Sequence, residues 1–254
     1  MTNLTRYGAD RFLLDNQPTL HPKLTKRLEL VWQAGRRGKP SLNADIQNAA
    51  EATRMLADPD FEVLGTNMTS ALSTFNAEGG ITLTTAGADG DGAILLPHLD
   101  ANQSAWTKFT WGTDREVYWE TYIETAASIA NAIIWAGLKL TNTPTVATDN
   151  DQVFVRYEDD VASGVFQVIE SIGGADTTTS TDITVAASTK YHIVIKINDD
   201  RTAEVTINGV LVRKTAALTD AVDLIPYVGV EADGAAAAKA ITVFGASISR
   251  LYGA

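Results

Sequence analysis

The sequence lacks cysteine altogether across its 254 residues. This absence excludes disulfides, thiolate metal sites and cysteine nucleophiles. Long apolar runs are also missing, since no stretch approaches the roughly 18 uninterrupted apolar residues that suggest a membrane-spanning helix. The stretch Met1–Gln17 has no apolar segment of the signal-peptide type. We therefore expect no membrane association and an intracellular or virion protein.

Basic residues are scarce, with 20 Lys and Arg against 31 Asp and Glu and a net charge of −11. This balance argues against general nucleic-acid binding by the whole chain. The charge is unevenly distributed, because residues 1–40 hold eight basic and three acidic residues, or +5, whereas residues 41–254 carry −16. A basic arm on an acidic body is expected to dock on a negatively charged surface. The alternative is a solvated tail without a partner.

Residues 1–40 are predicted to form an extended N-terminal arm, because prolines and glycines interrupt any regular periodicity. The arm nevertheless carries many large apolar side chains, which need a surface to cover on the chain's own body or on a neighbour. An acidic protein surface is favoured over nucleic acid as its target. We predict that the arm binds its partner through Arg6, Arg11, Phe12, Leu13, Lys23, Lys26, Arg27, Trp32, Arg36 and Arg37.

Residues 41–58 are predicted to form a short helix and linker. The helix is expected over residues 43–57, where alanine is abundant and apolar residues recur at helical spacing. Ser41 or Asn43 provides a cap, and Asp58 before Pro59 ends the helix.

Residues 59–254 are predicted to contain strands only. The stretch Lys190–Lys214 indicates two consecutive hairpins, because apolar residues alternate and Asn208-Gly209 forms a tight two-residue turn. Similar short strands without intervening helices favour an antiparallel sandwich of two stacked sheets, an all-β jelly roll. The threonine-rich run 176–181 is expected to be a loop.

Three patches resemble the concanavalin A-like lectin/glucanase superfamily in its laminin-G-like branch. They are Val117–Ala126, Tyr191–Val212 and Leu224–Tyr252. The resemblance implies the two-sheet jelly roll, but this fold serves lectins, hydrolases and structural modules alike. The arm, the sandwich and the cysteine-free composition together also look like the head decoration (cement) proteins of tailed phages.

One strand of the resemblance bears on catalysis. Family-16 glucanases of this superfamily place three carboxylates on one strand face, and this chain matches the outer two with Glu120 and Glu124. Tyr122 replaces the central aspartate, so no helper charge lies between the two acids. We expect both glutamates to lie on a solvated sheet face and predict no catalytic residues.

No metal or cofactor is expected. The loops Asp89–Gly92, Asp149–Asp151 and Asp159-Asp160 could offer oxygens to calcium, but such residues more often only form turns. The three histidines, His21, His98 and His192, have no metal-ligand spacing. The tryptophans are expected mainly in the core, with a sugar-stacking platform as the alternative: Trp32, Trp106, Trp111, Trp119 and Trp135.

These observations lead to one expected function and two alternatives. We expect a phage capsid decoration protein on the surface of the virion head, assembled in the host cytoplasm. Its partners would be the major capsid protein and further copies of itself, as a homotrimer. The first alternative is a carbohydrate-binding module for adsorption to the host surface, and the second is a glycoside hydrolase.

Overall fold

The computed structural model describes residues 41–45, 61–97, 112–141, 149–234 and 237–250. These residues form fifteen strands and two short 3-10 turns, η1 (Ser70–Leu72) and η3 (Ala162–Gly164). None of them belongs to a helix long and apolar enough to cross a membrane. The strands are β1 (Ser41–Asp45), β2 (Phe61–Leu64), β3 (Ser73–Phe75), β4 (Ile81–Thr84), β5 (Gly92–Pro97), β6 (Val117–Thr125), β7 (Ala132–Lys139), β8 (Gln152–Glu158), β9 (Val165–Ile172), β10 (Ala175–Thr184), β11 (Lys190–Ile197), β12 (Thr202–Ile207), β13 (Val210–Ala217), β14 (Ile225–Ala232) and β15 (Ala240–Arg250).

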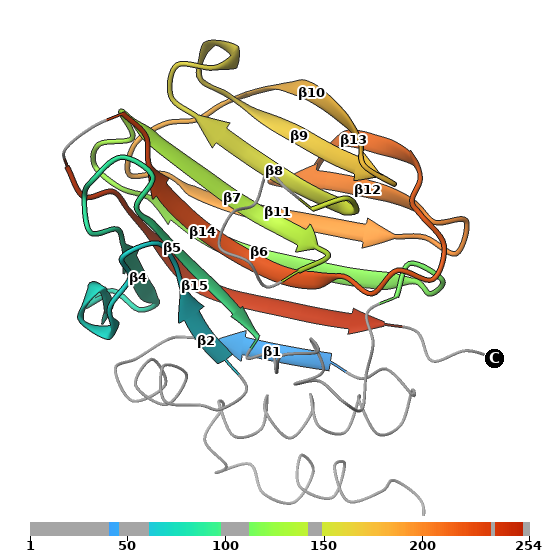
Figure 1. Ribbon diagram of the computed structural model, residues 1–254, viewed down its shortest axis with the longest axis horizontal. Coiled ribbons are helices and arrows are strands. Elements are labelled where there is room, and N and C mark those ends of the chain that lie inside the picture. The colour runs from blue at the N-terminus through green and yellow to red at the C-terminus, as the bar shows by residue number, and fades with distance from the viewer. Residues whose placement is uncertain (1–40, 46–60, 98–111, 142–148, 235–236, 251–254) are drawn as a thin grey trace, which may run out of the picture.

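The strands form two antiparallel sheets, which confirms the predicted all-β sandwich. The first sheet has the order β13-β12-β11-β6-β15-β4-β3, with β1 also paired to β15, and the second has the order β10-β9-β8-β7-β14-β5-β2. Strands distant in sequence, such as β6 and β15, are neighbours, as a jelly roll requires. Figure 1 shows β1 in blue lying beside the red β15 at the lower edge of the sandwich.

The main core lies between the two sheets. Along β6, Val117, Trp119, Thr121 and Ile123 are buried while the residues between them are open to solvent, because successive strand side chains point to opposite faces. The inward residues of β11, including Ile193 and Ile195, are fully buried against the same core. Alternation therefore confirms which face of the first sheet points inward.

The second sheet is buried on both faces at its centre. Its outward side chains form a separate apolar cluster that includes Trp135, Phe154 and Tyr227. Gly137 and Gly229 make room for these rings, since a Cβ on Gly137 would lie 2.4 Å from the Cβ of Phe154. Among the described residues, the outer face of the first sheet is therefore the more accessible of the two.

The predicted pair of hairpins is confirmed as β11, β12 and β13. Asn208 and Gly209 both have positive φ, 51° and 79°, as the tight turn between β12 and β13 requires. In the other turn, the Asn198 amide donates to the hydroxyl and carbonyl oxygens of Thr202, while Asp200 accepts hydrogen bonds from the backbone and hydroxyl of Thr202.

Two local predictions are wrong. The helix expected to begin at Asn43 starts instead as strand β1, because Ser41–Asp45 pairs antiparallel with Ser249–Gly245 of β15. This tertiary pairing overrides the local helix propensity, and the rest of the predicted helix lies outside the described residues. The threonine-rich run is not a loop but most of strand β10, paired with β9, since β-branched threonine favours extended backbone.

Candidate functional site

Two exposed tyrosines mark the outer face of the first sheet. Tyr118 and Tyr122 of β6 are 38% and 47% exposed, and they are two of the four large hydrophobic side chains exposed among the described residues. Glu120 and Glu124 lie on the same face, because the four residues alternate with the buried ones. The sequence had predicted this shared, solvated face for the two glutamates.

Glu120 accepts hydrogen bonds from three side chains on three strands. His192 Nε2 of β11 lies 2.9 Å from Oε2, Ser247 Oγ of β15 lies 3.1 Å from Oε1, and Tyr118 Oη lies 3.3 Å from Oε2. Burial, followed by the charge and hydrogen bond of Glu120, raises the pKa of Tyr118 to about 12. The phenol therefore stays protonated and donates to the carboxylate, which is held in one orientation between two exposed rings.

His192 is fixed from two directions. Its ring stacks parallel on Tyr122 with 4.1 Å between centroids. Its backbone N–H donates to Asn208 Oδ1, and its carbonyl accepts from the Asn208 N–H. The β12–β13 turn thus sets the position of the imidazole. We call Tyr118, Glu120, Tyr122, His192 and Ser247 the Glu120 patch.

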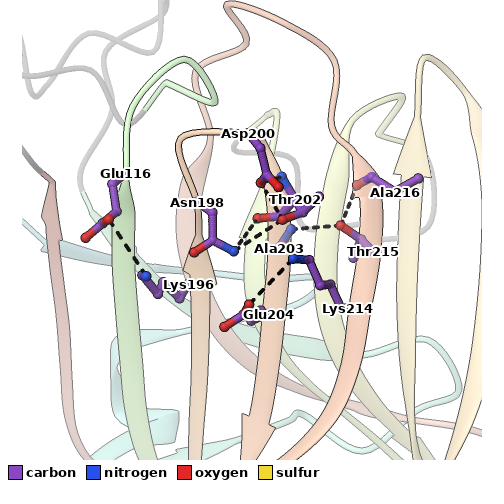
Figure 2. A network of polar contacts seen from close by, with 10 residues as sticks. All are labelled: Glu116, Lys196, Asn198, Asp200, Thr202, Ala203, Glu204, Lys214, Thr215 and Ala216. Carbon is purple, nitrogen blue, oxygen red and sulfur yellow. Dashed lines mark hydrogen bonds and ion pairs between the residues drawn. The ribbon is translucent and has the colours of Figure 1, made fainter.

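Other charges on this face are paired across strands. Lys196 lies 3.8 Å from Glu116, Lys190 lies 3.9 Å from Glu124, and Lys214 lies 3.8 Å from Glu204. Figure 2 shows the Glu116–Lys196 and Glu204–Lys214 pairs on neighbouring strands of the sheet. Such exposed pairs add little stability, but they neutralise the lysines around the patch.

The two glutamates that were compared with glucanase carboxylates have different partners in the structure. Glu120 binds His192, Ser247 and Tyr118, whereas Glu124 has Lys190 as its ion-pair partner. The tryptophan prediction is confirmed for Trp119 and Trp135, which are 1% and 5% exposed. The remaining tryptophans and all of the predicted arm residues lie outside the described part of the chain, so the arm's binding role stays a prediction.

The acidic loops mostly stabilise turns. Asp91 accepts hydrogen bonds from Asn67 Nδ2 and the Ala88 N–H, both at 2.6 Å, and Asp149 accepts from the backbone and hydroxyl of Thr141. Asp151 accepts from the Gly173 N–H and the Thr219 hydroxyl. These contacts agree with the expectation that such residues form turns.

One acidic cluster remains where β8 and β14 of the second sheet end. One oxygen each from Glu158, Asp160 and Asp233 lies within 4.8 Å of the others. Burial, with the nearby charges of Asp233, Asp89 and Glu158, raises the pKa of Glu231. Carboxylates suit a hard cation, but three ligands fall short of the six to eight oxygens that calcium takes.

Sequence reasoning missed the gathering of the Glu120 patch. The alternation in β6 and β11 did place Glu120, Tyr122 and His192 on definite strand faces. It gave no sign that β11 and β15 flank β6 on either side. Ser247 in particular reaches Glu120 through a pairing between residues more than one hundred positions apart.

Comparisons with known proteins define the family and the fold. A family model described as SO2946-like, C-terminal domain matches residues 98–226, half of the chain. No curated protein sequence matches the chain. The crystal structure of SO2946, a protein of unknown function from Shewanella oneidensis MR-1, is 13% identical with a TM-score of 0.60, covering 84% of this chain and 86% of that one.

Three further structures share the jelly roll. The metal-free carbohydrate recognition domain of Emp46p is 9% identical with a TM-score of 0.54, over 77% of this chain and 90% of that one. Winged bean acidic lectin, complexed with methyl-α-D-galactose, is 11% identical with a TM-score of 0.53, over 85% and 100%. Alginate lyase A1-II′ is 17% identical with a TM-score of 0.51, over 82% and 94%. The chain therefore has a concanavalin A-like fold shared by lectins and lyases.

Proposed function

Because this chain belongs to the SO2946-like family and has a concanavalin A-like jelly roll, we propose that it is a carbohydrate-binding protein. Its glycan lies on the outer face of the first sheet. The fold is shared with the carbohydrate recognition domain of Emp46p and with a lectin complexed with a galactoside. The observation that carries the proposal is the carboxylate of Glu120, held between the exposed rings of Tyr118 and Tyr122.

The patch can contact both the apolar and the polar parts of a sugar. The exposed tyrosine rings offer flat apolar faces against which the C–H groups of a pyranose can stack. The carboxylate and imidazole provide the few convergent polar groups that orient a ligand and give specificity. Since Glu120 is held by Ser247, His192 and Tyr118, little side-chain entropy is lost when a ligand binds.

The contacts of the patch favour a protein that binds its ligand without converting it. In a Ser–His–acid arrangement the imidazole touches the serine and takes its proton. Here Glu120 stands between the two, and Ser247 and His192 each bind the carboxylate. The imidazole is therefore not placed to take the proton of Ser247, although an alginate lyase shares the fold. We propose a non-enzymatic role.

A glycan array followed by calorimetry tests this function. Tyr118→Ala and Tyr122→Ala should each weaken binding at least tenfold, which is about 1.4 kcal/mol. Leu211→Ala is the matched control, because Leu211 is exposed on β13 of the same sheet but takes no part in the patch. Failure of the native protein to bind any glycan, or loss of binding only in the control, contradicts the proposal.

A second proposed role is decoration of a phage head, with residues 1–40 bound to the major capsid protein in the virion and the chain assembled as a homotrimer. The +5 charge of the arm beside the −16 of the remaining chain supports docking on an acidic surface. Strand β1 begins directly after the arm and pairs with β15, so the arm's point of attachment is fixed to the sandwich.

Deletion of residues 1–40 tests this role and leaves β1 intact. The truncated protein should keep the circular dichroism and melting temperature of a folded sandwich but no longer sediment with capsids. The full-length variant Arg36→Glu/Arg37→Glu should weaken capsid binding through charge alone. Undiminished binding by both variants overturns the proposal, and light scattering of the full chain tests the trimer.

A further inference from the structure

We infer that the ligand of the Glu120 patch is an uncharged, hydroxyl-rich glycan and that the patch discriminates against uronates and sulfated sugars. The inference rests on the proposed function and adds the chemical class of the ligand. It follows from two independent features of the described residues: which hydrogen-bonding positions of the patch remain open, and how the charges around it are arranged.

The first feature is that the open positions of the patch accept hydrogen bonds. An ionised carboxylate has about four acceptor sites, and three protein donors already occupy sites on Glu120. The fourth remains for a ligand donor. Ser247 directs its hydroxyl hydrogen toward Glu120, so its oxygen is left with acceptor capacity.

The imidazole adds another acceptor. Because a carboxylate can only accept, Nε2 of His192 carries the hydrogen that points at Glu120. Nδ1 makes no hydrogen bond to any described residue, and a ring that carries its single hydrogen on Nε2 offers Nδ1 as an acceptor. Glu120, Ser247 and this nitrogen therefore present acceptors, and a ligand that binds them has to supply donors. Sugar hydroxyls do this, whereas carboxylate and sulfate groups have no hydrogen to donate.

The second feature is the absence of an unpaired cation on this face of the described chain. The lysines of β11 and β13 that face outward are Lys190, Lys196 and Lys214, and each lies within 4.0 Å of a glutamate. Figure 2 shows two of these pairs. Arg213 binds Glu170 through two of its three guanidinium nitrogens, Nε and Nη2. Recognition of an anionic sugar usually relies on an arginine or lysine placed for it.

The two features act in the same direction. A uronate carboxylate placed over the patch would meet the negative charge of Glu120 without a cation to compensate, and it would offer acceptors to acceptors. An uncharged sugar avoids both penalties, since unfavourable like-charge contacts are a common source of specificity. Glu120 is therefore both the anchor for hydroxyl groups and the group that repels anions.

The test uses polysaccharides that differ at a single group of each sugar. Native polygalacturonate and alginate are compared with their carboxyl-reduced forms, in which each carboxylate has become a hydroxymethyl group. The native protein should bind at least one reduced polymer at least tenfold more tightly than its charged parent. Glu120→Gln should reduce this ratio to less than threefold, because it removes the charge while keeping the shape of the side chain.

Glu204→Gln is the matched control, since it removes a carboxylate from β12 on the same face, where its partner is Lys214. Its ratio should equal that of the native protein. The ratio compares two ligands on one variant, so partial unfolding does not mimic the effect.

Three outcomes overturn the inference. If a uronate binds as well as its reduced form and Tyr118→Ala abolishes that binding, the proposed function stands while the ligand class is wrong. If no polymer of either kind binds and the glycan array is also negative, the proposed function and the inference fail together. If Glu120→Gln keeps the full discrimination of the native protein, the charge of Glu120 is not what rejects anions.

Discussion

Lys139 allows a quantitative test of how burial affects stability. It belongs to β7 on the second sheet, is 1% exposed, and its Nζ lies 5.3 Å from the centroid of the Tyr227 ring. Burial lowers the pKa of Lys139 to about 8, although the charge of Asp149 partly opposes this shift. The folded protein therefore holds the proton of Lys139 less tightly than the unfolded chain does.

The sign of the pH dependence follows from this difference. An unfolded lysine has a pKa of about 10.4, so between pH 8 and about 10.4 the unfolded chain binds a proton that the folded protein has lost. Stability rises with pH across this window. The full difference between the two pKa values corresponds to about 3 kcal/mol, of which about 2 kcal/mol falls between pH 7.5 and 9.5.

Urea denaturation of the native protein and of Lys139→Met measures this effect. From pH 7.5 to 9.5, the native protein should gain about 2 kcal/mol in unfolding free energy relative to the variant. Tyr118, Tyr157 and Tyr227 have raised pKa values, so they lower stability only above about pH 10 and cancel between the two proteins. Parallel pH profiles for the native protein and the variant would refute the reasoning.

Two further predictions concern a buried ion pair and a close contact between strands. Arg213→Met should destabilise the protein by about 3 kcal/mol in urea denaturation, because the carboxylate of Glu170, which is 4% exposed, loses its partner at 2.8 Å. Adding Glu170→Met to this variant should restore most of the lost stability. Equal losses in the single and double variants would contradict this prediction. Gly137→Ala should cost about 3 kcal/mol by overpacking, since its Cβ would meet Phe154 at 2.4 Å, whereas the control Gly92→Ala meets nothing closer than 3.8 Å and should be tolerated. Equal melting temperatures for the two alanine variants would rule out the overpacking argument.

The parts of the fold that could be predicted are those that depend on short-range sequence patterns. The alternation from Lys190 onward predicts strands and Asn208-Gly209 predicts a tight turn, because the two-residue period of a strand and the left-handed backbone of the turn are local properties. The alternation of side chains along Glu120–Glu124 likewise predicted that Glu120 and Tyr122 share one face of β6. Part of the candidate site could therefore be predicted from the sequence.

The two wrong predictions concern segments whose structure depends on pairing with strands elsewhere in the chain. Asn43 and its neighbours have the composition of a helix, but Ser247 and the residues around it offer a strand with open hydrogen-bonding groups about two hundred positions away. The run 176–181 shows no alternation of polarity because β10 is an edge strand whose side chains are mostly exposed on both faces. Only the β-branching of threonine indicated a strand there.

The strand order explains why the patch lies where it does. β6 is central in the first sheet, with β11 on one side and β15 on the other, and its inward Trp119 is buried in the core. A side chain on such a strand is positioned by the core beneath it, so its outward neighbours Tyr118 and Glu120 are held rigidly. The two flanking strands then each contribute one polar group, His192 and Ser247. A binding site built on three paired strands needs no ordering of loops when its ligand arrives, and this supports placing it on the sheet face rather than at the acidic loops of the rim.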